Sequence, residues 1–373
     1  MILSPAHVNF RHLEQMTDDT GLLEHALGPV PKRGEGYTTD DNCRALWTVS
    51  EWIHLMNQNS ALNDSRTKSR LIRLADIYLA FLVWAQEPDG HFYNNFAYDR
   101  SREDEQPSDD CLGRTLWSIA RAYQCLPDEE RRLVTSTLFK NGFRAIHGMT
   151  HPRGQAFELS ALSVLLQSAK NEAEEKPLTK FIKSEAPDEI DRIESKLIRL
   201  YDNNSEADWH WFEPMMTYGN GVLPWALFQS YQVTGNPEAL RVAKSSIRFL
   251  MKKMVSPDDL IRPIGNNGWC TKDRLSQWDQ QPVEVMALAL AVEQAAGCLR
   301  PQEEYHHVIE KCRSWFHGEN DLHVPVISDE GGCCDGLRSD GLNRNQGAES
   351  TIAYLQTELI YTRTFLPAVQ VTR

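Results

Sequence analysis

The chain has 373 residues and a formal net charge of -13, with 10 Trp and 8 Cys. This acidic balance argues against a nucleic-acid partner, because nucleic-acid surfaces are bound by clustered Lys and Arg. The sequence has no apolar run long enough to span a bilayer and no basic start followed by an apolar run near Met1, so we expect no membrane partner and a cytoplasmic location.

Six segments along the chain look like helix beginnings with polar groups in the first turn. The first two open with a Ser or Thr followed by two Asp, which is typical of an N-cap and of carboxylates at the positive end of a helix dipole. The six beginnings are 39–47, 108–117, 155–162, 218–227, 279–286 and 344–351. They recur about every 50 to 70 residues, which is about the length of two helices and two loops.

Between these beginnings lie amphipathic segments with apolar residues at helical spacing on one face. They cover 69–84, 128–146, 237–251 and 301–315. In contrast, 283–296 is apolar nearly all round, as a helix wedged between an inner axis and an outer layer needs to be. The segment 170–191 is rich in Glu, Lys and Pro, and we interpret it as a solvated connection.

This alternation of buried and surface helices predicts an all-α fold. Six helical hairpins in a closed ring form an (α/α)6 toroid, here a single domain over residues 1–373. Tight Gly turns flanked by aromatics in 84–95 and 263–269, with little apolar–polar alternation elsewhere, predict few or no strands. The cysteines lie mostly in apolar helices and are interpreted as reduced thiols.

Carboxylates are concentrated at these helix beginnings. If the ring closes, they face one funnel, where like charges shift one another's pKa values apart and so provide an acid and a base. The candidates are Asp40, Asp41, Asp109, Asp110, Glu158, Glu213, Asp279, Glu284 and Glu349. The alternative for each Asp pair is structural: the first carboxylate caps the helix, and the second pairs with Arg44 or Arg114 one turn on.

Aromatic and amide side chains accompany the carboxylates. Aromatic faces stack on the apolar sides of sugar rings, while Asn and Gln bind hydroxyl groups. The further candidates for substrate binding are Tyr37, Arg44, Trp211, Tyr218, Asn220, Trp269, Gln281 and Asn345. Four other tryptophans are expected to fill helix interfaces instead, namely Trp47, Trp84, Trp117 and Trp225.

Three segments carry a family resemblance: 36–46, 217–225 and 279–284. With the toroid pattern, they resemble the six-hairpin glycosidase superfamily, and within it a bacterial group of uncharacterised glycosidase-like proteins. Similar segments in that group follow glycosyltransferase domains of the mannosyltransferase type. The likeness covers nearly the whole chain, and it implies an oligosaccharide substrate and a glycosyltransferase as a partner.

The reaction that the resemblance implies is hydrolysis of a glycosidic bond in a manno- or gluco-configured oligosaccharide, with inversion. An inverting pair of carboxyl groups lies about 6.5 to 9.5 Å apart. We expect Glu213 to be the acid, because Trp211 and Phe212 beside it would raise its pKa, and Asp279 or Asp109 to be the base. The two Asp of the first helix beginning then hold sugar hydroxyls.

Two other functions stay open. A sugar epimerase on the same toroid would move a proton with histidine, and His91, His151 and His210 lie in candidate loops. A carbohydrate-binding accessory domain that cooperates with a glycosyltransferase is the other. No cofactor is expected, and no metal site either, because the Cys and His spacings that zinc requires are missing.

Overall fold

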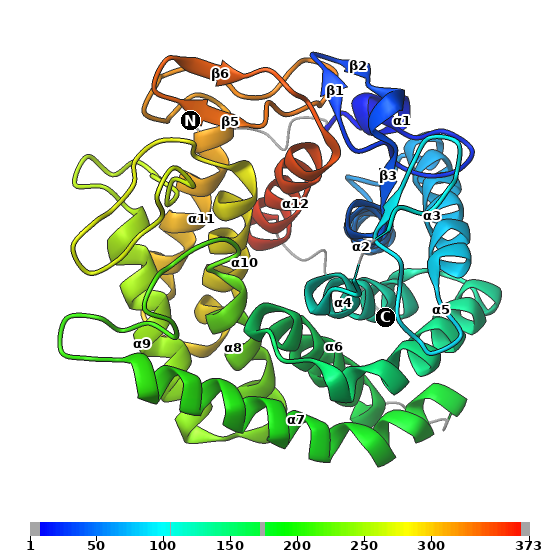
Figure 1. Ribbon diagram of the computed structural model, residues 1–373, viewed down its shortest axis with the longest axis horizontal. Coiled ribbons are helices and arrows are strands. Elements are labelled where there is room, and N and C mark those ends of the chain that lie inside the picture. Colours follow the sequence, from blue (N-terminus) through cyan, green and yellow to red (C-terminus); the bar gives the residue numbers. More distant parts are fainter. Residues whose placement is uncertain (1–7, 105, 172–175, 367–373) are drawn as a thin grey trace.

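The computed structural model describes residues 8–104, 106–171 and 176–366, which form a ring of helices around a central axis (Figure 1). The inner helices of this ring are α2 (Thr39–Gln58), α4 (Asp109–Cys125), α6 (Pro152–Asn171), α8 (Val222–Thr234), α10 (Pro282–Cys298) and α12 (Ala348–Phe365). Each inner helix packs against the next, and α12 packs against α2, which closes the ring. The predicted (α/α)6 toroid is confirmed.

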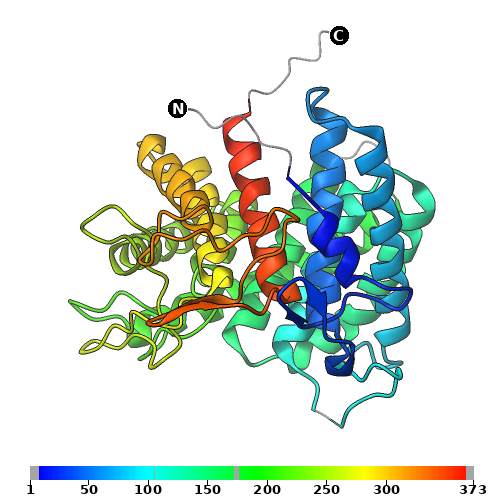
Figure 2. The ribbon, with the colours of Figure 1, turned by 90° about the horizontal axis from the view of Figure 1, so that it is seen from above.

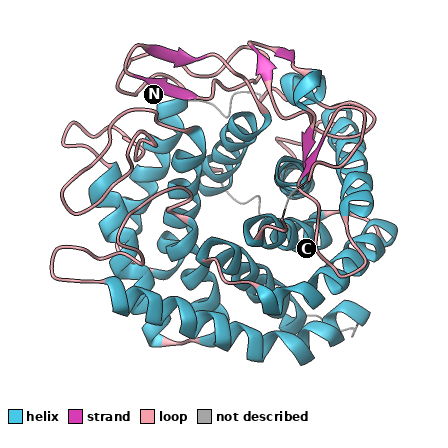
Figure 3. Ribbon diagram, viewed as in Figure 1, coloured by secondary structure: helices cyan, strands magenta, loops and turns pink. Residues whose placement is uncertain are grey.

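An outer layer of helices surrounds this ring (Figure 3). It consists of α3 (Ser65–Ala85), α5 (Glu129–Gly142), α7 (Pro177–Asn204), α9 (Pro237–Met254) and α11 (Gln302–Phe316), and each packs against the inner helix before it in the chain. The short α1 (Arg11–Met16) precedes the first inner helix and contacts α12. The chain therefore runs inward and outward in turn, as the alternation of buried and amphipathic segments predicts.

Short strands occur in the loops between the helices. They form three antiparallel pairs: β1 (Ala26–Leu27) with β2 (Val30–Pro31), β3 (Tyr37–Thr38) with β4 (Asn95–Phe96), and β5 (Gly336–Arg338) with β6 (Gly341–Asn343). Two short 3-10 helices are η1 (Arg33–Glu35) and η2 (Phe143–Gly148). Figure 2 shows the β5–β6 hairpin, in orange, at the end of the ring where α12 begins. The loops with strands therefore build the rim of the funnel.

The inner helices approach one another closely because small residues lie at their contacts. A Cβ atom on Gly113 of α4 would lie 2.2 Å from the backbone oxygen of Gly154 on α6, and one on Gly221 would lie 2.0 Å from that of Ala287 on α10. Neither position has room for a side chain. Close packing of this kind draws the first turns of the inner helices together around the axis.

The interpretation of 170–191 as a solvated connection is wrong for the greater part of that segment. Residues from Pro177 onward form the first half of α7, whereas residues 172–175 lie outside the described residues. Leu178, Ile182 and Ile190 are buried along one face of this helix. Most of the charged residues between them are exposed, with Glu189 as the buried exception. These charges and Pro187 hide the helical period in the sequence.

An ion network joins three inner helices further along the ring axis. Glu51 of α2 accepts hydrogen bonds from Arg121 of α4 and Arg363 of α12, both at 2.6 Å, and from the indole N–H of Trp47 at 2.8 Å. Although burial by itself would raise the pKa of Glu51, the two arginines hold it at about 2. The network ties the first hairpin to the last and supports the closure of the ring.

Within the described ranges, none of the helices combines the length and the apolar character that crossing a bilayer requires.

Candidate functional site

The first turns of α2 and α4 are capped by hydroxyl groups rather than by carboxylates. The Thr38 hydroxyl accepts the backbone N–H of Asp41 at 3.1 Å, and the Ser108 hydroxyl accepts that of Cys111 at 3.3 Å. The Asp side chains are therefore free of the capping role that the structural alternative gave to the first of each pair. The alternative is correct about the second of each pair: Asp41 lies 3.5 Å from Arg44, and Asp110 lies 3.1 Å from Arg114.

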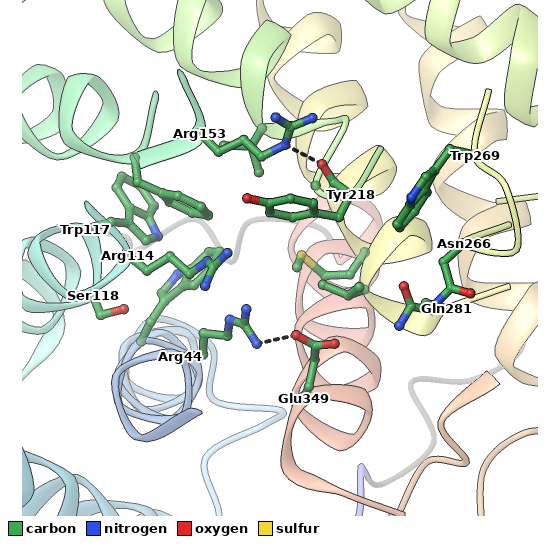
Figure 4. A pocket seen from close by; sticks show the side chains of 17 residues that line it. Arg44, Arg114, Trp117, Ser118, Arg153, Tyr218, Asn266, Trp269, Gln281 and Glu349 are labelled. Atoms are coloured by element: carbon green, nitrogen blue, oxygen red, sulfur yellow. Dashed lines mark hydrogen bonds and ion pairs between the residues drawn. The ribbon is translucent and has the colours of Figure 1, made fainter. Parts of the chain in front are cut away.

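Two adjoining cavities occupy the funnel at the beginnings of the inner helices. We call the first the polar cup; it has a volume of about 330 Å3 and is lined by Glu24, His25, Thr38, Asp40, Asp41, Arg44, Asn94, Asn95, Gln281, Asp335, Asn345, Gly347 and Glu349. We call the second the deep chamber; it also measures about 330 Å3 and is lined by Arg44, Trp47, Arg114, Trp117, Ser118, Arg153, Phe157, Tyr218, Gly219, Val222, Asn266, Trp269, Gln281, Val283, Met286, Ala287 and Glu349. Arg44, Gln281 and Glu349 line both, so the cavities meet at these side chains (Figure 4).

A third hollow of about 460 Å3 opens beside the polar cup. Asp279, Arg338 and Asn343 line it, together with Gln281 and Asp335, which it shares with the cup. Asp279, one of the predicted bases, therefore lies at the mouth of the funnel. Its backbone has a left-handed φ of 59°, and its carbonyl oxygen accepts the N–H of Asn266 at 3.1 Å.

The neighbouring carboxyl groups of Asp40 and Asp41 have opposite electrostatic surroundings. Burial would raise the pKa of Asp40, but Arg114 at 2.5 Å and Arg44 hold it below its usual value. Burial, which is opposed by Arg44 and reinforced by Glu349 and Glu24, raises the pKa of Asp41 to about 7. One carboxyl group of the pair is thus held ionised, while its neighbour carries a proton near neutral pH.

Further carboxyl groups of the polar cup respond to burial in the same direction. Burial raises the pKa of Glu24 and that of Asp335. Asp335 accepts a hydrogen bond from the Ser350 hydroxyl at 2.6 Å. Glu349 differs, because it forms an ion pair with Arg44 at 2.7 Å and its side chain is 38% exposed to the cavities. Glu349 is therefore a carboxyl group that a ligand can reach.

Arginines and aromatic rings surround the deep chamber. Arg153 forms two hydrogen bonds to the carboxylate of Glu213, at 2.8 and 3.1 Å, and its guanidinium lies 4.6 Å from the ring centre of Tyr218. The Tyr218 hydroxyl donates to Asp110 at 2.8 Å. Figure 4 shows Tyr218 between Arg153 and the open centre of the chamber, with Trp269 beside it. The Tyr218 ring is thereby held in one orientation.

The structure brings many of the predicted site residues to these cavities and their mouth. These are Asp40, Asp41, Arg44, Tyr218, Trp269, Asp279, Gln281, Asn345 and Glu349. Asp110 and Glu213 contact the chamber indirectly, through Tyr218 and Arg153. Glu213 lines neither cavity, and both of its carboxylate oxygens accept hydrogen bonds from Arg153, so the geometry does not favour it as the acid.

Other predicted residues lie away from the cavities, where they support the fold. Asp109 accepts the backbone N–H groups of Thr150 and His151, at 2.6 and 2.8 Å, at the start of α6. Trp211 is fully buried and packs against Phe212, so it does not face a ligand. The reason for both is local: the carboxylate satisfies a helix end, and the ring fills the core.

Buried polar pairs account for four more of the predicted residues. Glu284 accepts hydrogen bonds from the backbone N–H of Gly219 and from the side chain of Asn220, which ties α10 to the start of α8. Tyr37 donates to Asp18 at 2.7 Å. Glu158 is buried beside Glu189 on the outer helix α7, and this burial raises its pKa well above its usual value. Glu158 therefore points away from the funnel, because it lies on the outward face of α6.

Several lining residues were not predicted from the sequence. Trp47 and Trp117 were assigned to helix interfaces, and although they pack edge to face at 5.4 Å, both also line the deep chamber. Glu24, His25 and Asp335 come from loops without a helical period, so no spacing in the sequence indicated them. The Gly331–Gly332 pair before Asp335 was the one available signal for a rim loop.

Histidines and metal ligands do not gather in the funnel. Among the described residues, His25 is the histidine that lines the polar cup, and its Nδ1 contacts the Asn345 amide at 3.1 Å. His210 lies on a separate outer groove with α9. The described part of the chain contains no group of three or more His, Cys, Asp or Glu arranged to hold a metal ion.

Comparison with known proteins gives a likeness of fold. Neither the family models nor the curated proteins contain a match to this sequence. Among solved structures, cellobiose 2-epimerase from Bacillus thermoamylovorans B4167 has a TM-score of 0.67 at 12% identity, over 94% of this chain and 95% of that one. A D-mannose isomerase has a TM-score of 0.66 at 10% identity, over 96% and 97%. The GH76 α-mannanase of Bacteroides thetaiotaomicron has 0.63 at 11%, over 95% and 94%. At these identities the likeness is one of fold, and it agrees with the predicted (α/α)6 toroid.

Proposed function

We propose that the protein hydrolyses a glycosidic bond of a manno- or gluco-configured substrate, with Asp41 as the proton donor. The observation that supports this best is the contrast between Asp41, whose pKa is raised to about 7, and Asp40, whose pKa is held low. A general acid must carry its proton at the working pH, and Asp41 does so in a cup that also offers amide and carboxylate groups to sugar hydroxyls.

Glu349 is the second carboxylate of the proposed reaction. It lies where the two cavities meet and forms an ion pair with Arg44. One Arg44 nitrogen lies 2.7 Å from a Glu349 oxygen and 3.5 Å from an Asp41 oxygen, so the two carboxyl groups share one guanidinium group. Retaining pairs of carboxyl groups lie closer together than inverting pairs, at about 5 to 5.5 Å. The shared guanidinium is the reason for proposing Glu349 as a nucleophile, with retention.

Inversion, which the family resemblance implies, would need a base farther from Asp41. Asp279 at the mouth of the funnel is the predicted residue that suits this role. The anomeric form of the first product distinguishes the two carboxylates. Retention supports Glu349, and inversion supports Asp279.

The test is a screen of the purified protein against manno- and gluco-configured glycosides and oligosaccharides of each linkage. Released sugar is followed by chromatography and its anomeric form by NMR. We expect turnover that is lost in Asp41→Asn and Glu349→Gln and kept in Glu213→Gln. Saturable sugar binding in calorimetry without turnover would instead support an accessory binding role beside a glycosyltransferase.

Sugar epimerisation is the second candidate, because His25 lines the polar cup and lies 3.5 Å from Glu24. A histidine beside a carboxylate can remove a proton next to a sugar carbonyl. An epimerase would introduce deuterium from heavy water at that carbon of a reducing sugar and would release no shorter product. The same reactions, followed by NMR in heavy water, therefore separate the two functions.

A further inference from the structure

The two cavities that meet at Glu349 have different chemical linings. The polar cup is walled by carboxylates, amides and one histidine. The deep chamber is lined mainly by aromatic and aliphatic side chains, among them Trp117, Phe157, Val222 and Met286, and also by three arginines. A sugar ring needs a hydrogen-bond partner for nearly every hydroxyl that leaves water, whereas an apolar group needs none.

The charged groups that reach the deep chamber already have partners. The guanidinium groups of Arg114 and Arg153 are bound to Asp40 and Glu213, at 2.5 and 2.8 Å. The uncharged polar side chains of the lining include Ser118, Asn266 and Gln281, so a hydroxyl group has fewer partners here than in the polar cup. The chamber therefore favours an apolar ligand group, whose removal from water is favourable and which can lie flat against aromatic rings.

The size of the deep chamber sets the scale of that group. An apolar cavity of about 150 Å3 holds a benzene molecule. The chamber has a volume of about 330 Å3, which gives room for an aryl group or a short alkyl chain. Since Arg44, Gln281 and Glu349 line both cavities, one ligand can occupy the two at once.

We infer that the substrate is a glycoside with an apolar aryl or alkyl aglycone, whose sugar binds in the polar cup and whose aglycone binds in the deep chamber. This inference rests on the proposed hydrolysis. The scissile bond then lies at the junction of the cavities, beside Glu349. The leaving group is an alcohol or phenol, and its oxygen takes the proton from Asp41 as its bond to the anomeric carbon breaks. Glu349 forms a bond to that carbon, and water then displaces Glu349 to release the free sugar.

The test compares aglycones on one sugar. The sugar that the screen selects is offered as its methyl, butyl, octyl and phenyl glycosides and as a disaccharide. We expect kcat/KM for the phenyl and butyl glycosides to exceed that for the methyl glycoside by about tenfold or more, the effect of a few apolar groups in a pocket. Equal kcat/KM across the series, or preference for the disaccharide, would overturn the inference of an aglycone site but would still support the proposed hydrolysis.

A variant of the chamber wall gives an independent measurement. Met286→Gln makes the wall polar at nearly constant volume, and Met215→Gln is the matched control, since Met215 is exposed and lines neither cavity. Met286→Gln should remove most of the advantage of the phenyl glycoside over the methyl glycoside, whereas Met215→Gln should keep that advantage. An unaltered preference in Met286→Gln would count against the chamber as the aglycone site.

Calorimetry separates failure of the inference from failure of the proposed function. Phenyl glycosides can bind more tightly than methyl glycosides without any hydrolysis. If Met286→Gln removes that difference in affinity, the aglycone site is supported although the proposed hydrolysis is not. If phenyl and methyl glycosides bind equally tightly, the inference of an aglycone site is wrong, whether or not the protein hydrolyses either of them.

Discussion

Replacement of Asp41 by Asn should abolish activity and at the same time stabilise the protein. Burial disfavours the ionised form of this carboxyl group, so the folded protein holds the proton more tightly than the unfolded chain does. The stability penalty is absent well below the ordinary pKa of 3.8, grows as the pH rises, and is complete above the folded pKa of about 7. Asn has the shape of the protonated carboxyl group and no such penalty.

The magnitude follows from the two pKa values. A difference of this size corresponds to about 4 kcal/mol of unfolding free energy at pH 8 and about 2 kcal/mol at pH 5, where the folded group is still protonated. Urea unfolding of wild type and Asp41→Asn at both pH values measures these differences. The kcat of the variant should fall by about 100-fold to 10,000-fold, the usual worth of a general acid. In the wild type, kcat should decline above about pH 7, as Asp41 loses its proton.

The adjacent residue supplies the control. Asp40→Asn removes a carboxylate whose pKa is lowered, and it leaves the buried Arg114 without its shortest contact. We expect this variant to lose about 2 kcal/mol at neutral pH, opposite in sign to the change at Asp41. The reasoning would be refuted if Asp41→Asn were no more stable than wild type at pH 8, or if its advantage did not shrink between pH 8 and pH 5.

Three further variants test other parts of the structure. Glu213→Gln should keep kcat within about tenfold of wild type, because Glu213 lines neither cavity and contacts the deep chamber only through Arg153. A loss as large as that of Asp41→Asn would restore Glu213 to the acid role. Trp269→Ala should raise KM about tenfold with a smaller effect on kcat, because the Trp269 ring contributes binding surface to the deep chamber. Initial rates over a range of substrate concentrations measure both constants, and an unchanged KM would contradict this prediction. Glu51→Gln should lower the free energy of unfolding by about 3 kcal/mol at pH 7, because Arg121 and Arg363 lower the pKa of Glu51 to about 2. In urea unfolding, the difference from wild type should shrink as the pH falls from about 4.5 toward 2. A constant difference would show that the ion network is not the cause.

The helical architecture was predictable from the sequence because it depends on local patterns. Apolar residues at a spacing of 3.6 indicated the buried and amphipathic helices, and Ser or Thr before Asp marked the starts of α2 and α4. The exception is the start of α7, where charged residues dominate the composition although Ile182 and Ile190 keep the helical period. In that segment the charged composition led to the prediction of a solvated connection, whereas the spacing of the apolar residues indicates a helix.

The candidate site was predictable only in part, because side-chain direction depends on how the helices pack. Asp109 and Asp110 are neighbours in a motif like that of Asp40 and Asp41, yet Asp109 binds the start of α6 and Asp110 binds Tyr218. The sequence cannot tell which of two adjacent carboxylates meets an arginine from another helix. That choice fixes which one is ionised.

By itself, the sequence indicated the six inner helices and four of the outer ones, and so the closed ring that gathers carboxylates at one end. Only the tertiary structure decided that Asp40 meets Arg114 of the next inner helix while Asp41 is buried near Glu349 of the last one. The reason is physical. Helix formation responds to neighbours within a few residues, whereas a pKa responds to burial and to charges within a few ångströms, whatever their distance along the chain.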